Sequence, residues 1–507
     1  MNPIFDLIGV GLVIVATLLI GVYGLRVSRT TSDFFVASRT VRPVWNASAI
    51  SGEYLSAGTF LGLSGLVLLE GARGFWFPIG YAAGYLLVLV FVAAPLRRSG
   101  AYTIPDFIEA RLESVRARRV TSAAVLIIGW LYIVPQLHGA GLTLSVVAGL
   151  PEWVGEVAVA VLVAGSVAAG GMRAITYVQA FQYWLKLFAL LVPLVCIVFA
   201  LTGGPRDIDP VVIFPAEAGP AGFELYETMS LMLALVLGTM GLPHVLVRFY
   251  TSPTGVSARQ TTVLVIVMVS AFYAVSSGMG LVSRIVAPDL ADPAVADTAA
   301  LVLPARVFPG LFGELLTALV VAGAFAAFLA TSAGLIVSLA GVISQDVFSG
   351  SVRAFRLSAV LCAAVPLAVA LLTSPAGLGS SVGMVFVFAA SMLSPVVLLG
   401  VWWAGLTARG AVAGMVTGGL APALALLVHT AVGGVGAAAP FLAQPAAWTI
   451  PLATAVTVGV SLLGGGAAPS RADRFLARLH TPERAEGRPP GRSSGADPAE
   501  HRPSSGE

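Results

Sequence analysis

Residues 46–65, NASAISGEYLSAGTFLGLSG, form a membrane-length apolar segment whose middle is rich in Gly, Ser and Thr and contains one acid, Glu53. A helix of this composition is expected to break in mid-membrane. Broken membrane helices are tolerated only where the freed backbone groups line a protein cavity or bind something. The segment therefore predicts a solute and ion site of the kind that membrane transporters contain.

The composition of the whole chain places this segment in a polytopic membrane protein. Of 507 residues, 57% are hydrophobic and only 10% are charged, and the mean hydropathy is +0.93. These values lie outside the range of soluble globular proteins. The net charge is only +3 and the basic residues do not gather on one face, so nucleic acid is not an expected partner. Cys196 and Cys362 lie inside apolar runs without metal-site or disulfide spacing, and we expect them to be inert packing residues.

Apolar stretches long enough to cross about 30 Å of hydrocarbon predict an all-α protein with about 13 transmembrane helices. They are expected near residues 4–26, 46–69, 74–96, 120–147, 154–172, 177–202, 225–248, 261–287, 308–343, 355–374, 381–404, 410–430 and 446–464. Arg-rich loops alternate with neutral or acidic loops, which predicts a multi-pass cell-membrane protein with the amino terminus outside and the carboxyl terminus in the cytoplasm. We predict a transmembrane domain over residues 1–464 and a tail over 465–507 that is disordered apart from a short stretch around 475–479.

A second interrupted helix, SLMLALVLGTMGLPHVLVRFYT at residues 230–251, follows five spans after the first. An odd offset inverts the topology in the membrane. Two broken helices related in this way indicate an inverted repeat, with halves over about 46–202 and 225–404. Such halves are expected to enclose a site near the bilayer midplane.

Several motifs in this order resemble those of the sodium:solute symporter family, closest to its cation/acetate (monocarboxylate) branch. The motifs are SDFFVASR at 32–39, GEYLSAGTFLGLSG at 52–65, GAYTIPDFIEARL at 100–112, LYIVPQLHGAG at 131–141, GTMGLPHVLVRFYT at 238–251 and ISQDVF at 343–348. The resemblance extends to about residue 464. It implies the leucine-transporter fold, a 5+5 inverted repeat of membrane helices, and transport by alternating access.

The resemblance also implies sodium as the coupling ion, bound between the first broken helix and the ninth span. The implied ligands are the backbone carbonyls of Gly52, Leu55 and Ala327 and the hydroxyls of Thr331 and Ser332. The sequence departs from the family at two places: Ala330 stands where many members have a second hydroxyl, and Gln179 where many have an Asp. Without the resemblance, helix packing would be the expected role of both hydroxyl residues. No organic cofactor and no obligate protein partner is expected.

For an anionic solute, the half-helix that begins near Ala57 offers free amide donors and the positive end of a helix dipole. An apolar pocket would hold the alkyl group. The predicted solute contacts are Ser56, Gly58, Thr59, Phe60, Gln136, Thr239 and Met240. His138 is a second-rank contact, because a lone His on a membrane helix more often bonds a backbone carbonyl.

Four ionisable residues are candidates for coupling or gating: Glu53, Lys186, His244 and Arg248. Glu53 is expected to face a cavity or a partner, to be protonated, or to make a structural bond at a shallower depth. Lys186 is expected to pair with Glu53 or to extend to an interface. His244 and Arg248 are spaced i, i+4 and share a helix face. We expect Arg248 to anchor the helix at the cytoplasmic interface, with gating as a secondary role.

Together these features predict a secondary active symporter that imports a small monocarboxylate, such as acetate, propionate or pyruvate, with sodium. The alternatives are proton coupling through Glu53, another solute such as proline or urea, and a transporter-like membrane sensor. No nucleophile–base pair or HExxH ligand set occurs in any span, so the chain is not expected to be an enzyme.

Overall fold

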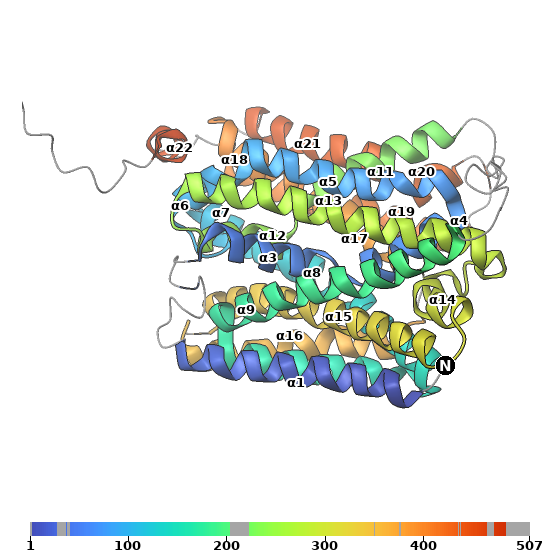
Figure 1. Ribbon diagram of the computed structural model, residues 1–507. Coiled ribbons are helices and arrows are strands. Elements are labelled where there is room, and N and C mark those ends of the chain that lie inside the picture. The colour runs from blue at the N-terminus through green and yellow to red at the C-terminus, as the bar shows by residue number, and fades with distance from the viewer. Residues whose placement is uncertain are drawn as a thin grey trace, which may run out of the picture.

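The structure, a computed structural model, describes residues 3–27, 37, 41–202, 223–348, 350–374, 377–433, 436, 438–463 and 471–482. All regular elements in these ranges are helical. In chain order the α-helices are α1 Pro3–Val27, α3 Pro43–Tyr54, α4 Leu63–Glu70, α5 Trp76–Leu87, α6 Ala93–Ser99, α7 Ile104–Leu112, α8 Val115–Ala148, α9 Glu152–Thr202, α11 Glu224–Thr239, α12 Pro243–Val247, α13 Gly255–Val286, α14 Ala299–Val307, α15 Leu311–Asp346, α16 Val352–Leu372, α17 Leu378–Met392, α18 Ser394–Trp402, α19 Ala408–Val432, α20 Ala439–Ala443, α21 Ala446–Leu463 and α22 Ala472–His480. The longer helices run side by side along one axis (Figure 1).

Within the described ranges, 11 helical segments are long and apolar enough to cross a membrane. Two of them, Gly58–Ser99 and Glu152–Thr202, have 42 and 51 residues. At about 1.5 Å per residue, each is long enough for two crossings of about 30 Å. Glu152–Thr202 turns at Gly171, whose φ of 59° is a conformation that glycine adopts readily. The predicted total of about 13 crossings agrees with this division.

Both predicted helix interruptions are present. The first lies between α3 and a π-helical turn, Gly58–Gly62 (η2), that leads into α4. The second lies between α11 and α12, which is followed by the short 3₁₀ helix Arg248–Thr251 (η5). Membrane helices with such interruptions form the binding sites of inverted-repeat transporters.

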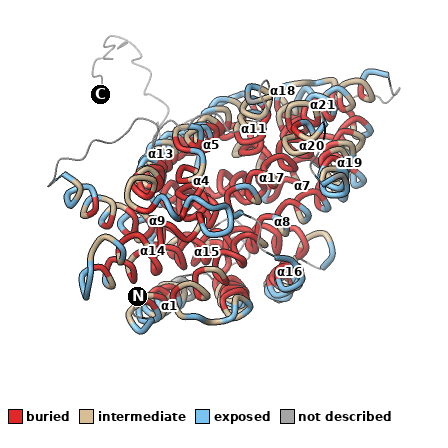
Figure 2. The backbone as a smooth tube through the Cα atoms, turned by 90° about the vertical axis from the view of Figure 1, so that its right-hand side faces the viewer, coloured by how far each residue is buried: buried red, intermediate tan, exposed pale blue. Residues whose placement is uncertain are grey.

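The centre of the molecule is formed by α15, whose most apolar 18-residue window is entirely buried, whereas only 22% of the corresponding window of α1 is buried. Figure 2 shows the same contrast, with buried backbone along α15 and α17 and exposed backbone along the outer helices. In a membrane, those outer apolar faces would contact lipid. The two broken helices pack against the central group, so their breaks lie far from solvent.

The motif GAYTIPDFIEARL contains the short helix α7. Thr103 caps it, because its hydroxyl accepts from the Asp106 amide while Asp106 accepts from the Thr103 amide. On the buried side of α7, Arg111 donates to the carbonyls of Gly400 and Trp403 at 3.0 and 2.9 Å, which satisfies the end of α18. This arginine has a structural role.

The stretch around 475–479, which the sequence set apart within the tail, forms α22 and packs on the main body. Arg98 Nη1 donates to the Leu479 carbonyl at 3.1 Å, and His480 Nε2 lies 3.0 Å from the Val401 carbonyl. The Leu479 side chain is fully buried. In Figure 1, α22 is seen end-on beside α18. The rest of the predicted disordered tail, 464–470 and 483–507, lies outside the described residues.

Candidate functional site

The first helix break frees the last carbonyls of α3. The final α-helical bond in this segment runs from the Leu55 amide to the Ser51 carbonyl, at 3.1 Å, and Leu55 itself is extended, with φ −76° and ψ 94°. The carbonyls of Gly52, Glu53 and Leu55 therefore need partners from elsewhere. They also form the negative end of the α3 dipole, which favours a cation.

The ammonium of Lys186 supplies partners for two of these carbonyls. Its Nζ donates to the Gly52 carbonyl and to the Leu55 carbonyl, the latter at 2.7 Å. Thr331 of α15 satisfies the third, donating its hydroxyl to the Glu53 carbonyl at 2.7 Å and lying 3.5 Å from the Leu55 carbonyl. Two of the five predicted sodium ligands are thus in direct contact with a lysine ammonium.

The close approach of α9 to α3 explains how Lys186 reaches the break. A Cβ on Gly52 would lie 2.2 Å from the Gln179 carbonyl, so only glycine permits this contact. Lys186 follows Gln179 by seven residues, about two helical turns, and therefore lies on the same face of α9. Its side chain is fully buried. Of the two roles predicted for Lys186, neither occurs: among the described residues its ammonium forms no ion pair with Glu53, and it does not extend to an interface.

The other predicted sodium ligands lie on α15. Ala327 precedes Thr331 by one turn, and both are completely buried. The Ser332 hydroxyl is buried and has no hydrogen-bond partner in the described part of the chain. The structure therefore brings Thr331 to the first break, and the sodium site as a whole stays a prediction.

Three amides at the start of the half-helix after the first break, including that of Thr59, already have partners. Gln136 of α8 accepts from the Ala57 amide at 2.8 Å. The Ser56 carbonyl accepts from the amides of Thr59 and Phe60 at 3.1 and 2.8 Å, and from the Thr59 hydroxyl at 3.0 Å. Gln136, predicted as a solute contact, therefore lies at the break and caps the half-helix, and its contact with a solute stays a prediction.

The two breaks meet at a pair of hydroxyls. Tyr54, the last residue of α3, lies with its hydroxyl 3.0 Å from Thr239 Oγ1, at the end of α11. Met240, the next residue, is buried. Phe60, in contrast, points to α13, where its ring is 6.0 Å from that of Phe272. The predicted solute contacts thus divide between two places.

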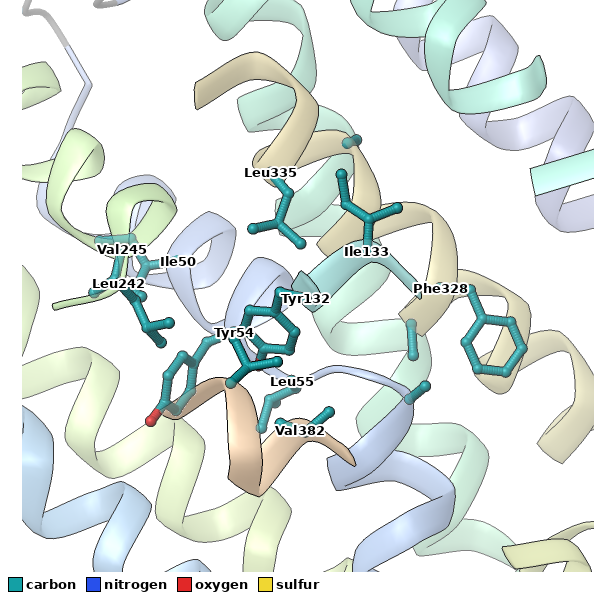
Figure 3. Packing of buried hydrophobic residues seen from close by; sticks show 14 of the residues in the cluster. Ile50, Tyr54, Leu55, Tyr132, Ile133, Leu242, Val245, Phe328, Leu335 and Val382 are labelled. Atoms are coloured by element: carbon teal, nitrogen blue, oxygen red, sulfur yellow. The ribbon is translucent and has the colours of Figure 1, made fainter. Parts of the chain in front are cut away.

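An aromatic cluster surrounds the Tyr54–Thr239 contact. The rings of Tyr54 and Tyr85 are 4.7 Å apart, and those of Tyr81 and Phe386 are 4.8 Å apart. Tyr132 lies 6.1 Å from Phe386. Figure 3 shows this hydrophobic region, with Tyr54, Leu55 and Tyr132 at the first break and Leu242 and Val245 after the second. These tyrosines were not among the predicted site residues. Their one signal in the sequence is position: Tyr54 lies in the first interrupted span, Tyr81 and Tyr85 in the next span, and Tyr132 in the LYIVPQLHGAG motif.

Several buried polar groups in and beside this cluster lack partners in the described part of the chain. They include the Tyr85 hydroxyl, both ring nitrogens of His244, the Ser56 hydroxyl, and the hydroxyl of Tyr273, whose ring is 5.8 Å from that of Tyr81. The His244 ring is 5.2 Å from that of Tyr132. Buried polar groups are normally hydrogen-bonded, so such groups are candidates for contacts with a ligand.

Glu53 and Arg248 form a buried ion pair. Arg248 Nε donates to Glu53 Oε2 at 2.7 Å, and each side chain is only 1% exposed. Arg248 also donates to Thr176 Oγ1 at 2.9 Å and to Gln179 Oε1. The prediction that Arg248 anchors the helix at the interface is wrong, because its side chain is buried and paired with Glu53. Of the roles predicted for Glu53, the structure shows one: its carboxylate is buried and faces a partner, Arg248.

Glycine at position 334 of α15 makes room for this pair. A Cβ there would lie 2.0 Å from the Glu53 carboxyl carbon. Gln179 connects the pair to α15, because its Nε2 donates to the Ala330 carbonyl at 2.8 Å. Elsewhere, His138 Nε2 lies 3.2 Å from the Ala370 carbonyl, the structural contact that is common for a membrane histidine.

Comparison with known proteins identifies the family. The sodium:solute symporter family matches residues 34–418. The chain belongs to the sodium:solute symporter family. A Bacillus subtilis (strain 168) relative named uncharacterized symporter YwcA is 33% identical over 424 residues, which cover 79% of this chain and 82% of the relative. A Corynebacterium glutamicum relative named monocarboxylic acid transporter is 31% identical over 475 residues, 85% of each chain.

Solved structures of other symporters share the fold of this family member. A Na⁺-coupled sialic acid symporter in a substrate-bound outward-open state has a TM-score of 0.70 at 15% identity, covering 92% of this chain and 99% of that one. A nucleobase-cation-symport-1 family transporter, Mhp1, in a closed conformation has a TM-score of 0.55 at 14% identity, covering 87% and 98%. The predicted leucine-transporter-type fold is confirmed. The family and both structural neighbours are transporters.

Proposed function

We propose that this chain is a secondary active symporter that imports a small monocarboxylate, such as acetate, propionate or pyruvate, together with sodium. Family membership supports solute symport and supports sodium as the coupling ion. The monocarboxylic acid transporter from C. glutamicum supports the solute class. The predicted orientation, with the amino terminus outside, belongs to this proposal.

The observation that carries the proposal is the meeting of the two helix breaks inside an aromatic cluster. Tyr54 and Thr239 join the breaks, and the rings of Tyr132 and Phe386 lie beside them. Aromatic walls suit a short alkyl group, while a carboxylate needs N–H or O–H donors.

We assign the carboxylate contact to His244 and Tyr85. Both are buried and without partners in the described part of the chain, whereas the amides of Ala57, Thr59 and Phe60 after the first break are already engaged. A carboxylate would satisfy the unpaired groups and gain charge-assisted or neutral hydrogen bonds from them. Release towards the cytoplasm then requires α3 to separate from η5, which the Glu53–Arg248 pair now holds together.

The test is uptake of radiolabelled acetate into proteoliposomes under an inward sodium gradient, compared with an inward proton gradient. We expect sodium-driven uptake in the wild type and at least a tenfold loss in His244→Ala. His429→Ala, on α19 and remote from the breaks, is the matched control and should transport normally. Absence of acetate uptake under both gradients would exclude acetate as the solute and would not affect the family assignment.

A second candidate is proton coupling, and one observation favours it. The carbonyls of Gly52 and Leu55, which the family resemblance assigns to sodium, are held by the Lys186 ammonium. Uptake driven by a proton gradient and indifferent to sodium would establish this alternative.

A further inference from the structure

We propose that the side-chain ammonium of Lys186 is the resident cation of the first helix break, and that sodium does not share this position with it. The proposal concerns the ion position within the proposed symporter and therefore rests on that function. It implies that a transported sodium ion binds these carbonyls only after Lys186 has left them, or binds other ligands.

The first argument is geometric. A sodium ion coordinated by the carbonyl oxygens of Gly52 and Leu55 would lie between those two atoms, which is where Lys186 Nζ donates its hydrogen bonds. The ion and the ammonium would overlap. The remaining predicted ligands with side chains, Thr331 and Ser332, supply only hydroxyls, and Thr331 already donates to the Glu53 carbonyl at 2.7 Å.

The second argument is the local charge. Lys186 carries +1, Arg248 carries +1 and Glu53 carries −1, so the buried group has a formal charge of +1 when all three are ionised. Glu53 Oε2 is paired with Arg248 at 2.7 Å, so the single negative charge of this carboxylate is already balanced by the guanidinium, although its Oε1 has no hydrogen-bond partner in the described part of the chain. A sodium ion would raise the charge to +2 within a buried region, where like charges about 4 Å apart repel strongly.

The third argument is that the position is built for a lysine. The chain contains one lysine among its 28 Lys and Arg residues, and its side chain is fully buried. Burial of an ammonium is favourable only with hydrogen-bond acceptors, and a helix carboxyl end supplies carbonyls together with the negative end of its dipole. Gly52 permits the approach of α9 that delivers the side chain. Replacing Lys186 by a small neutral residue should therefore leave a vacant, ready-made cation position.

The test is the melting temperature (Tm) of the purified full-length protein in sodium chloride and in choline chloride of equal ionic strength. The variants are Lys186→Ala, Lys186→Gln, Thr331→Ala and the double variant Lys186→Ala/Thr331→Ala. Lys186→Gln is the matched control, because its amide can donate to the carbonyls without a charge. We expect any sodium-specific rise in the Tm of the wild type to be unchanged by Thr331→Ala. In Lys186→Ala we expect a further sodium-specific rise of about 2–4 °C, absent from Lys186→Gln and from the double variant.

Two results would overturn the proposal. One is a sodium-specific rise in the wild type that Thr331→Ala abolishes, because sodium would then occupy this position with Lys186 present. The other is a Lys186→Ala protein that folds and gains no sodium response. Should Lys186→Ala fail to fold, the comparison of the wild type with Thr331→Ala still decides. No carboxylate is present in the assay, so its outcome is independent of whether acetate is transported.

Discussion

The two helix breaks of this symporter occupy corresponding places in the two halves but satisfy their backbones in different ways. At the first break, other helices supply a lysine ammonium, a threonine hydroxyl and a glutamine side chain, from Lys186, Thr331 and Gln136. At the second, the backbone bonds are local: the amides of Met240 and Gly241 donate to carbonyls three residues earlier, at 3.0 and 2.8 Å. Ser394 adds one neutral hydroxyl, donated to the Leu237 carbonyl at 2.6 Å.

The two halves of the fold therefore share a helix break but not the chemical groups that satisfy it. Both breaks expose the negative end of a helix, and within the described part of the chain a side-chain ammonium is hydrogen-bonded to carbonyls at the first of them. That contact depends on α9, which packs closely against α3 at Gly52 and carries Lys186. In the function proposed above, the first break would be the ion position and the second would lie beside the solute.

The largest loss of stability should come from breaking the ion pair between Glu53 and Arg248. Arg248→Met leaves the Glu53 carboxylate buried without its partner, which should lower the free energy of unfolding by about 3–5 kcal/mol. Thermal or denaturant unfolding in detergent would measure this. Arg306→Met, which removes an exposed pair with Asp289, is the control and should have no measurable effect. Equal stability of the two variants would mean that the buried pair does not hold the breaks together.

The close contact at Gly52 offers the next largest effect. A Cβ at Gly52 would meet the Gln179 carbonyl at 2.2 Å, and one at Gly241 would meet the Ala389 carbonyl at 2.1 Å. Each Gly→Ala change should destabilise the protein by about 3 kcal/mol through overpacking. Only Gly52→Ala should also alter the Lys186 contact and admit a sodium response. Gly11→Ala, on α1 with no neighbour within 4 Å, is the control. A sodium response in Gly241→Ala would contradict the assignment of the ion position to the first break.

Removing a side-chain hydrogen bond to the backbone should reduce stability more at the first break than at the second. Gln136→Leu leaves the buried Ala57 amide without an acceptor, which should reduce stability by about 2 kcal/mol. Ser394→Ala at the second break should reduce it by less, because the Leu237 carbonyl still accepts from the Met240 amide. Unfolding midpoints of both variants would show the order, and the reverse order would mean that the second break depends more on its neighbours.

The smallest effect is expected at the contact that joins the breaks. Tyr54→Phe removes the hydroxyl bond to Thr239, but the Thr239 hydroxyl still donates to the Leu235 carbonyl at 2.9 Å. The loss should be about 1 kcal/mol. A double-mutant cycle with Thr239→Val measures the coupling directly. Additive effects would show that the hydroxyls do not interact.

Much of the architecture could be predicted from the sequence, because apolar spans and their glycine-rich interruptions are patterns of neighbouring residues. The two breaks followed in this way. The place of Thr331 at the first break came from the family resemblance alone, and Gln136 was predicted as a solute contact rather than as the acceptor for the Ala57 amide. The partners of charged side chains could not be predicted. Arg248 looked like an interface anchor because the positive-inside rule counts residues along a continuous helix, whereas the break leaves it buried against Glu53. The contact of Lys186 depends on the turn at Gly171 and on the packing of α9, which the local sequence does not fix.

The only lysine of the chain is also its only side chain with a primary amine, and that amine lies fully inside the protein. A membrane-permeant acylating reagent can therefore react with a side-chain amine only when the first break opens. Under conditions where reaction is faster than closing, the labelling rate counts openings directly; otherwise it reports the fraction of time that the break is open. The acylation rate of Lys186 therefore reports the opening of the first break without any introduced label site.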